Sequence, residues 1–108
     1  MHNVFISYST QDRHVADAIC HIFEANGVKC WYAPRDVVPG SSYSSEITVA
    51  IKQSEIFVLV LSSNSNESQY VLNEVEIATS LGKIVMPLKI EETELSNDMY
   101  FYVKRLHW

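Results

Sequence analysis

The chain has 108 residues, of which 47% are hydrophobic and 19% charged, with a formal net charge of -5. This length suits one domain with one core. The acidic balance excludes nonspecific nucleic-acid binding and attraction to an anionic membrane, since both need a basic surface. No apolar run approaches the roughly 18 residues that span a bilayer, and no signal-peptide pattern opens the chain. These features predict a cytoplasmic domain with two reduced, buried thiols, Cys20 and Cys30.

Strand and helix patterns alternate along the chain. Short apolar runs predict strands at residues 4–6, 28–32, 55–61 and 84–88. Helical spacing predicts a first helix with Val15, Ile19, Ile22 and Phe23 on its inward face, and further helices at residues 46–52 and 66–81. Gly27 and Gly82 follow two of these helices as stop signals. Pro87 places the last strand near an edge or at its end.

The remaining segments are predicted as loops or short elements. Two prolines and a glycine make residues 33–41 a loop. The acidic stretch 91–98 is expected to be a solvated loop, and residues 100–103 a short strand or a turn of helix. Ser9 and Asp12 have the spacing of a helix capping box, and the serine and asparagine cluster at residues 62–66 offers further caps.

This alternation predicts an α/β fold, with parallel strands joined by right-handed crossovers and helices on both faces. Ligands of such sheets bind beyond the carboxyl ends of the strands, where the strand order reverses. The loops at that edge are residues 7–12, 33–41 and 62–70.

The helix predicted for residues 66–81 carries a carboxylate on its apolar side. With Tyr70 at 0° and about 100° per residue, Val71 and Val75 fall at about 100° and 140°, and Glu74 at about 40°. Glu67 also points inward, at about 60°, where the helix dipole accounts for a carboxylate. Glu76 falls at about 240° and is therefore predicted to be solvated.

Two interpretations of Glu74 remain open from its spacing. Tyr70 and Glu74 are four residues apart and are neighbours on a helix, so they can form a pocket for a flat or cationic ligand. Alternatively, Glu74 pairs with a lysine or caps a neighbouring loop. The four histidines lack metal-ligand spacing, and the sequence has no glycine-rich phosphate loop and no nucleophile elbow.

Three sequence boxes resemble one known family. Residues 4–9 with Asp12 (VFISYS, then D) are similar to the opening box of Toll/interleukin-1 receptor (TIR) domains. Residues 31–36 (WYAPRD) with Pro39 and Gly40 resemble the second box, a loop between strand and helix. Residues 62–65 and 68–74 (SSNS and SQYVLNE) resemble the exit of the third strand and the helix with the family's catalytic glutamate. The boxes are in register over essentially the whole chain.

The resemblance implies a fold and an activity. The family fold is a flavodoxin-like three-layer sandwich around a central five-stranded parallel sheet. Many members cleave NAD+ between nicotinamide and ribose, and some cyclise the product into immune signals. By position, the catalytic glutamate is Glu74 and the stacking aromatic, often tryptophan, is Tyr70. NAD+ is then a substrate, and no cofactor or metal is expected.

One carboxylate suffices for this chemistry, because nicotinamide in NAD+ is cationic and leaves as a neutral molecule. Its departure leaves an oxocarbenium-like ribose, which a fixed carboxylate stabilises. Substitution of Glu74 by alanine or glutamine is therefore expected to keep the fold and abolish cleavage. The side chains expected to meet ribose or phosphate are Ser7, Tyr8, Ser62, Ser63 and Asn64, with help from backbone N–H groups at the helix start.

The resemblance also implies partners. Family enzymes assemble through TIR–TIR contacts, for which the expected assembly loop comprises Arg35, Asp36, Val37, Pro39 and Gly40. With its short loops and no receptor features, the chain resembles bacterial TIR modules, so an antiphage effector is expected. The last helix of the family is expected to lie beyond residue 108, which predicts a truncated TIR domain within a longer protein that carries a sensor domain. The alternative function is a non-catalytic TIR adaptor.

Overall fold

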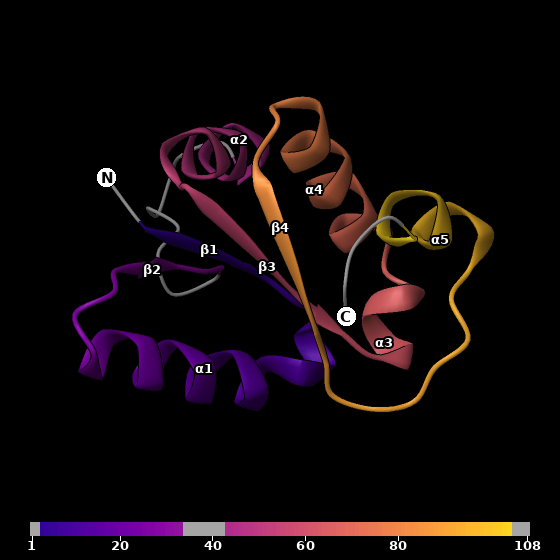
Figure 1. Ribbon diagram of the computed structural model, residues 1–108, viewed down its shortest axis with the longest axis horizontal. Helices are drawn as coiled ribbons and strands as arrows, with labels where there is room; N and C mark the ends of the chain where they lie inside the picture. Colours follow the sequence, from indigo (N-terminus) through magenta and orange to yellow (C-terminus); the bar gives the residue numbers. More distant parts are fainter. Residues whose placement is uncertain (1–2, 34–42, 105–108) are drawn as a thin grey trace.

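The computed structural model describes residues 3–33 and 43–104. Within them, four parallel strands form one sheet: β1 (Val4–Ser7), β2 (Cys30–Trp31), β3 (Ile56–Leu61) and β4 (Ile84–Lys89). The helical elements are η1 (Thr10–Asp12), α1 (Arg13–Ala25), α2 (Tyr43–Gln53), α3 (Ser63–Asn66), α4 (Gln69–Ser80) and α5 (Asn97–Val103). Helix α1 covers one face of the sheet, and α2 and α4 cover the other (Figure 1). The predicted three-layer α/β fold with a parallel sheet is confirmed.

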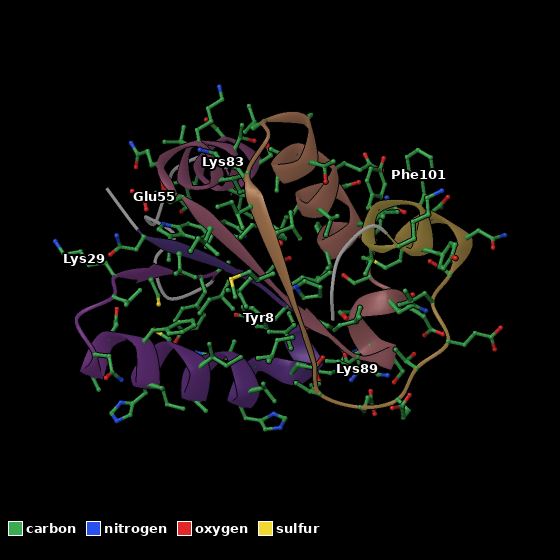
Figure 2. All side chains as sticks on the ribbon, in the orientation of Figure 1. Tyr8, Lys29, Glu55, Lys83, Lys89 and Phe101 are labelled. Carbon is green, nitrogen blue, oxygen red and sulfur yellow. The ribbon has the colours of Figure 1, made fainter. Side chains whose placement is uncertain are left out.

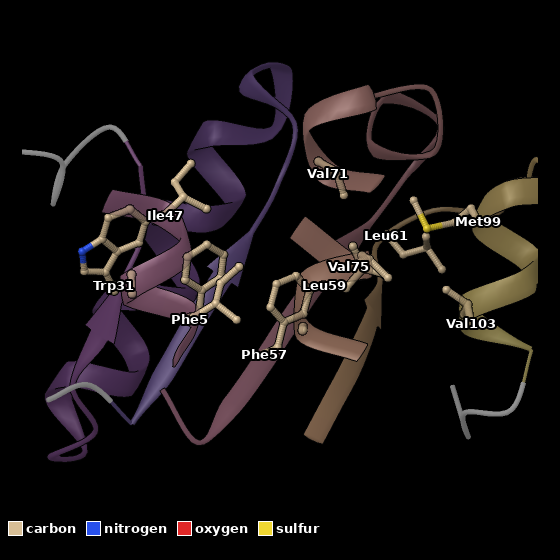
Figure 3. Packing of buried hydrophobic residues seen from close by; sticks show 13 residues of the cluster. Phe5, Trp31, Ile47, Phe57, Leu59, Leu61, Val71, Val75, Met99 and Val103 are labelled. Atoms are coloured by element: carbon tan, nitrogen blue, oxygen red, sulfur yellow. The ribbon is translucent and has the colours of Figure 1, made fainter. Parts of the chain in front are cut away.

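Alternate side chains of β1, β2 and β3 supply two separate cores. On the α2–α4 face, Phe5 stacks between Trp31 and Phe57, with ring centroids 5.2 and 5.3 Å apart (Figure 3). On the α1 face, the intervening strand residues pack against Ala16 and Cys20 of α1. The core residues on both faces of these three strands are apolar because both faces are covered there. Cys20 and Cys30 are buried and are not joined in a disulfide, as predicted.

The strand order β2-β1-β3-β4 places the topological switch between β1 and β3. The chain passes from β1 to β2 on one side and then returns to β3 on the other. Ser7, the last residue of β1, is in register with Leu59, so both strands end at the same edge of the sheet. Parallel sheets bind ligands in the crevice at such a point. The loops after β1 and β3 are therefore brought together as predicted.

The helix predicted for residues 66–81 begins only at Gln69, and a separate short helix, α3, precedes it. Ser62 caps α3, and its Oγ accepts a hydrogen bond from the Ser65 N–H at 3.1 Å. Ser68 caps α4, its Oγ accepting from the Val71 N–H at 3.2 Å. The break between these caps leaves Glu67 exposed at the end of α3, so its predicted inward position was wrong. Gly82 ends the helical segment with a φ of 69°, which confirms the predicted stop.

Two predictions near α1 were also wrong. Neither Ser9 nor Asp12 makes a side-chain cap, because the Ser9 hydroxyl donates to Gln11 and the Asp12 carboxylate accepts hydrogen bonds from residues after β3. Ile22, predicted to point inward, is 60% exposed, since the buried face of α1 is centred on Ala16 and Cys20.

The segment after β4 is more ordered than expected. The acidic stretch is irregular only as far as Ser96, whose Oγ accepts from the Met99 N–H and caps α5. Met99 and Val103 then pack into the α4 side of the core, so residues 100–103 form part of a helix. Within the described part of the chain β4 pairs with β3 alone, which agrees with the edge position predicted from Pro87. None of the described helices has the length and apolar character to cross a membrane.

Candidate active site

Glu74 is held in the buried face of α4. Val71, Val75 and Ala78 of the same helix pack against the sheet and bring Glu74 to the end of β1. Its side chain is only 9% exposed, and the Ser7 hydroxyl donates a hydrogen bond to Glu74 Oε1 at 2.6 Å. Glu76, by contrast, is exposed, as predicted. Helical phase therefore distinguished the two carboxylates correctly.

Burial changes the acidity of Glu74. Removal of water from the carboxylate raises its pKa from 4.5 to about 7, because desolvation disfavours the charged form. The hydrogen bond from Ser7 lowers the pKa, but its effect is smaller than that of burial. Glu74 has the Ser7 side chain as a hydrogen-bond partner, and Glu74 and Tyr70 line one cavity, which supports the pocket interpretation. Perturbed carboxylates in crevices are typical of functional sites.

A cavity of about 860 Å³ opens beside Glu74, within the range of small-molecule sites. Its lining residues are Phe5, Ile6, Tyr8, Ser9, Thr10, Gln11, Ala33, Asn64, Glu67, Ser68, Gln69, Tyr70 and Glu74. Four of the predicted site residues, Tyr8, Asn64, Tyr70 and Glu74, are thus brought together. They come from the segments after β1 and after β3.

The two aromatic site residues of the cavity differ in their packing. Tyr8 packs edge-on against Tyr32, with ring centroids 5.9 Å apart. Figure 2 shows Tyr8 within the body of the fold, whereas Lys29 projects from the periphery. Tyr70 is 72% exposed, one helical turn before Glu74. The cavity therefore has one packed tyrosine ring and one at its rim.

The other three predicted residues do not line the cavity. Ser7 is buried and is bonded to Glu74. Ser62 is fully buried, caps α3, and donates its hydroxyl hydrogen bond to Asp12 Oδ2. Both the N–H and the hydroxyl of Ser63 donate to Glu91 Oε1 at 2.8 Å. The Ser63 N–H, at the start of α3, is thus already bonded to a carboxylate of the same chain.

The Ser63 contact also accounts for the acidity of Glu91. Hydrogen bonds from the Ser63 N–H and then from its hydroxyl hold the pKa of Glu91 below its usual value. Glu91 therefore stays ionised and bonded to the start of α3 over the neutral pH range.

Several residues that line the cavity were not predicted from the sequence. Thr10 and Gln11 lie on η1, and Ser68 and Gln69 lie at the α3–α4 break. Both segments fall within the loops that the topology placed at the site, but no spacing rule selected individual residues in them. The expected assembly loop, Arg35 to Gly40, lies outside the described residues. In the part of the chain that the structure describes, no group of three His, Cys, Asp or Glu side chains is placed to hold a metal ion.

The fold and the site define an α/β protein with a carboxylate-bearing pocket at the switch point of a parallel sheet. The family model for the TIR domain matches residues 4–108. The chain therefore belongs to the TIR domain family, as the three sequence boxes predicted.

Individual relatives agree with this assignment. The Toll-like receptor 4 of Pinctada imbricata is 32% identical over 77 residues, which are 69% of this chain and 9% of that protein. The TIR domain of the Toll-related receptor TRR-2 from Hydra magnipapillata has the same fold, with a TM-score of 0.84 and 22% identity over 95% of this chain and 81% of that one. The TIR domains of the activated Roq1 resistosome, which recognises the pathogen effector XopQ, give a TM-score of 0.72 and 26% identity over 82% of this chain and 57% of that one.

Proposed function

We propose that this chain cleaves NAD+ at the bond between nicotinamide and ribose, with Glu74 as the catalytic residue. The observation that carries the proposal is a single desolvated carboxylate, 9% exposed and bonded to one hydroxyl, at the switch-point pocket of a TIR domain.

The chemistry needs a fixed negative charge. As the C–N bond breaks, its electron pair leaves with the nicotinamide nitrogen and positive charge develops on the ribose. Ionised Glu74 stabilises that charge, and the interaction is strong because the carboxylate is shielded from water. Attack by water then gives ADP-ribose and releases a proton, whereas attack by an adenine nitrogen of the same molecule gives a cyclic product. We propose the hydrolase reaction, with the cyclase reaction as its variant.

The lining residues suit the nicotinamide riboside half of the substrate. The Tyr70 ring at the rim offers a flat surface for a cationic pyridinium. Tyr8 and Asn64 offer polar groups to the ribose. Ser7 acts on Glu74 by orienting the carboxylate that it hydrogen-bonds. Substrate contacts by Ser62 and Ser63 stay predictions, because the structure gives these hydroxyls other partners.

We further propose that the activity serves immune signalling and requires assembly of several TIR domains. The family assignment and the likeness to the TIR domains of an activated resistosome support this role. This chain spans 9% of the length of the Pinctada receptor, so a sensor domain elsewhere in the full protein is part of the proposal. The bacterial, antiphage and cytoplasmic setting, and the Arg35–Gly40 contact between copies, stay predictions.

A non-catalytic TIR adaptor is the second candidate. The observation that favours it is a row of exposed apolar side chains on β4: Ile84, Met86 and Leu88 are 62%, 50% and 42% exposed. Such a row suits contact with another TIR domain. An adaptor, however, has no need for a buried carboxylate beside a cavity.

One incubation separates the two candidates. Concentrated protein is mixed with NAD+, with and without a crowding agent, and free nicotinamide is measured by chromatography. We expect nicotinamide to appear together with ADP-ribose or a cyclic isomer. If the protein self-associates and no nicotinamide forms, the adaptor function replaces the enzymatic one.

A further inference from the structure

Asp12 is a buried carboxylate whose position in the sequence does not explain its contacts. It stands at the N-cap of α1 and is 6% exposed, but its side chain makes no capping hydrogen bond. Its two oxygens instead accept hydrogen bonds from Ser62 and Asn64, which are 50 and 52 positions away. The cost of burying a carboxylate is met by contacts with the segment after β3.

The two oxygens of Asp12 contact two different kinds of residue: Ser62, which is buried, and Asn64, which lines the cavity. Oδ2 accepts from the hydroxyl of Ser62, which also caps α3. Oδ1 accepts from Nδ2 of Asn64 at 3.3 Å. Asn64 lines the cavity, whereas Asp12 and Ser62 do not. Asp12 therefore does not line the cavity itself but contacts a residue that does.

An ionised carboxylate can only accept hydrogen bonds. Asn64 must therefore present its NH₂ group to Asp12, and its amide cannot rotate by 180° without losing that bond. Its side-chain carbonyl oxygen has no partner among the described residues and is the polar atom left for a ligand. The acceptor is thus fixed by a residue that does not touch the ligand.

We infer that Asp12 is a positioning residue that fixes the Asn64 amide, so that the Asn64 side-chain carbonyl oxygen accepts a hydrogen bond from a ribose hydroxyl of the substrate. The ribose assignment rests on the proposed NAD+ cleavage. The Asp12–Asn64 contact stands on the geometry alone.

Asp12→Asn tests the inference while keeping a side chain of similar size and shape at position 12. The Oδ1 atom of the introduced asparagine can still accept from Ser62, but its NH₂ group then faces Asn64 and favours the inverted amide. The pocket would gain a donor where it had an acceptor. In a Glu74→Gln background, which is not expected to consume the ligand, we expect the Kd for NAD+ to rise about tenfold. The side-chain amide resonances of Asn64 should shift in NMR spectra of the same variant.

The exchanged pair provides the rescue. In Asp12→Asn/Asn64→Asp, the NH₂ group of the introduced asparagine donates to the introduced carboxylate, whose other oxygen again offers an acceptor to the pocket. We expect the Kd to return to within about threefold of the background value, since one hydrogen bond is restored. Asp98→Asn and Asn97→Asp make the same charge changes at exposed positions outside the cavity and should leave the Kd unchanged.

The outcomes separate this inference from the proposed function. An unchanged Kd together with unchanged Asn64 resonances in Asp12→Asn overturns the inference. A weakened Kd that the exchanged pair does not restore also overturns it, and leaves Asp12 a structural role. If the background variant does not bind NAD+ at all, the substrate assignment fails, and the Asn64 resonances still decide whether Asp12 fixes the amide.

Discussion

At the scale of single residues, Glu74 is governed by two opposing effects. Burial favours its protonated form and raises its pKa to about 7, whereas the Ser7 hydrogen bond favours the ionised form. The carboxylate therefore changes charge within the physiological range. Because the proposed reaction needs the ionised form, we expect NAD+ cleavage to rise with pH and to level off above about pH 7.

Ser7→Ala tests this balance. Loss of the hydroxyl removes the contribution that lowers the pKa of Glu74, so the midpoint of the pH–activity profile should move above that of the unmodified protein. Ser80→Ala removes a hydroxyl from the exposed end of α4 and should leave the midpoint in place. The measurement is kcat/KM for NAD+ from about pH 5 to 9, a range that brackets the titration of Glu74. An unchanged midpoint in Ser7→Ala contradicts the assigned effect of Ser7.

At the scale of elements, the cap of α4 sets where the catalytic helix begins. Ser68 accepts from the Val71 N–H, and loss of such a cap costs about 1 kcal/mol. Ser68→Ala should therefore lower the free energy of unfolding by about that amount, as measured by urea denaturation. Ser80→Ala, which removes no cap, should change it by less than about 0.5 kcal/mol. Equal effects in the two variants would show that Ser68 does not act as a cap.

The elements also show what the sequence could predict. The alternation of strand and helix patterns was sufficient to predict the parallel sheet, and helical phase was sufficient to predict that Glu74 is buried. Both predictions depend on local periodicity in the sequence. The α3–α4 break and the contacts of Asp12 were missed for another reason. Ser68 and Asp12 each have several possible partners, and only the folded chain selects among them.

At the scale of the whole molecule, Glu74 links stability to pH. Between pH 4.5 and about 7 the unfolded chain has this carboxylate ionised while the folded chain keeps it protonated. The folded state thus binds the extra proton, and raising the pH through this window destabilises it by about 3 kcal/mol. Glu74→Gln has no carboxyl group at this position, so it does not lose this stability as the pH rises. Its free energy of unfolding should therefore exceed that of the unmodified protein at about pH 8, with a smaller difference at about pH 4.5.

Denaturation of both proteins at these two pH values checks the prediction. Glu76→Gln, which alters an exposed carboxylate of the same helix, serves as the control and should follow the unmodified protein. If Glu74→Gln shows the same pH dependence as the unmodified protein, Glu74 is not the desolvated group.

Assembly is a second property of the whole molecule. If the site is completed only between copies, activity per mole should fall on dilution, because the competent state becomes less populated. We expect a clear loss of specific activity over about a hundredfold dilution. Constant specific activity over that range would contradict a requirement for assembly.

The central claim is that the carboxylate of Glu74 carries NAD+ cleavage, and matched variants on one helix test it most directly. Nicotinamide release is measured for the unmodified protein, Glu74→Gln and Glu76→Gln under the same assembly conditions, after circular dichroism has shown that all three are folded. We expect Glu74→Gln to lose about a thousandfold in rate or more and Glu76→Gln to keep its activity. Cleavage by Glu74→Gln at the rate of the unmodified protein would contradict the claim.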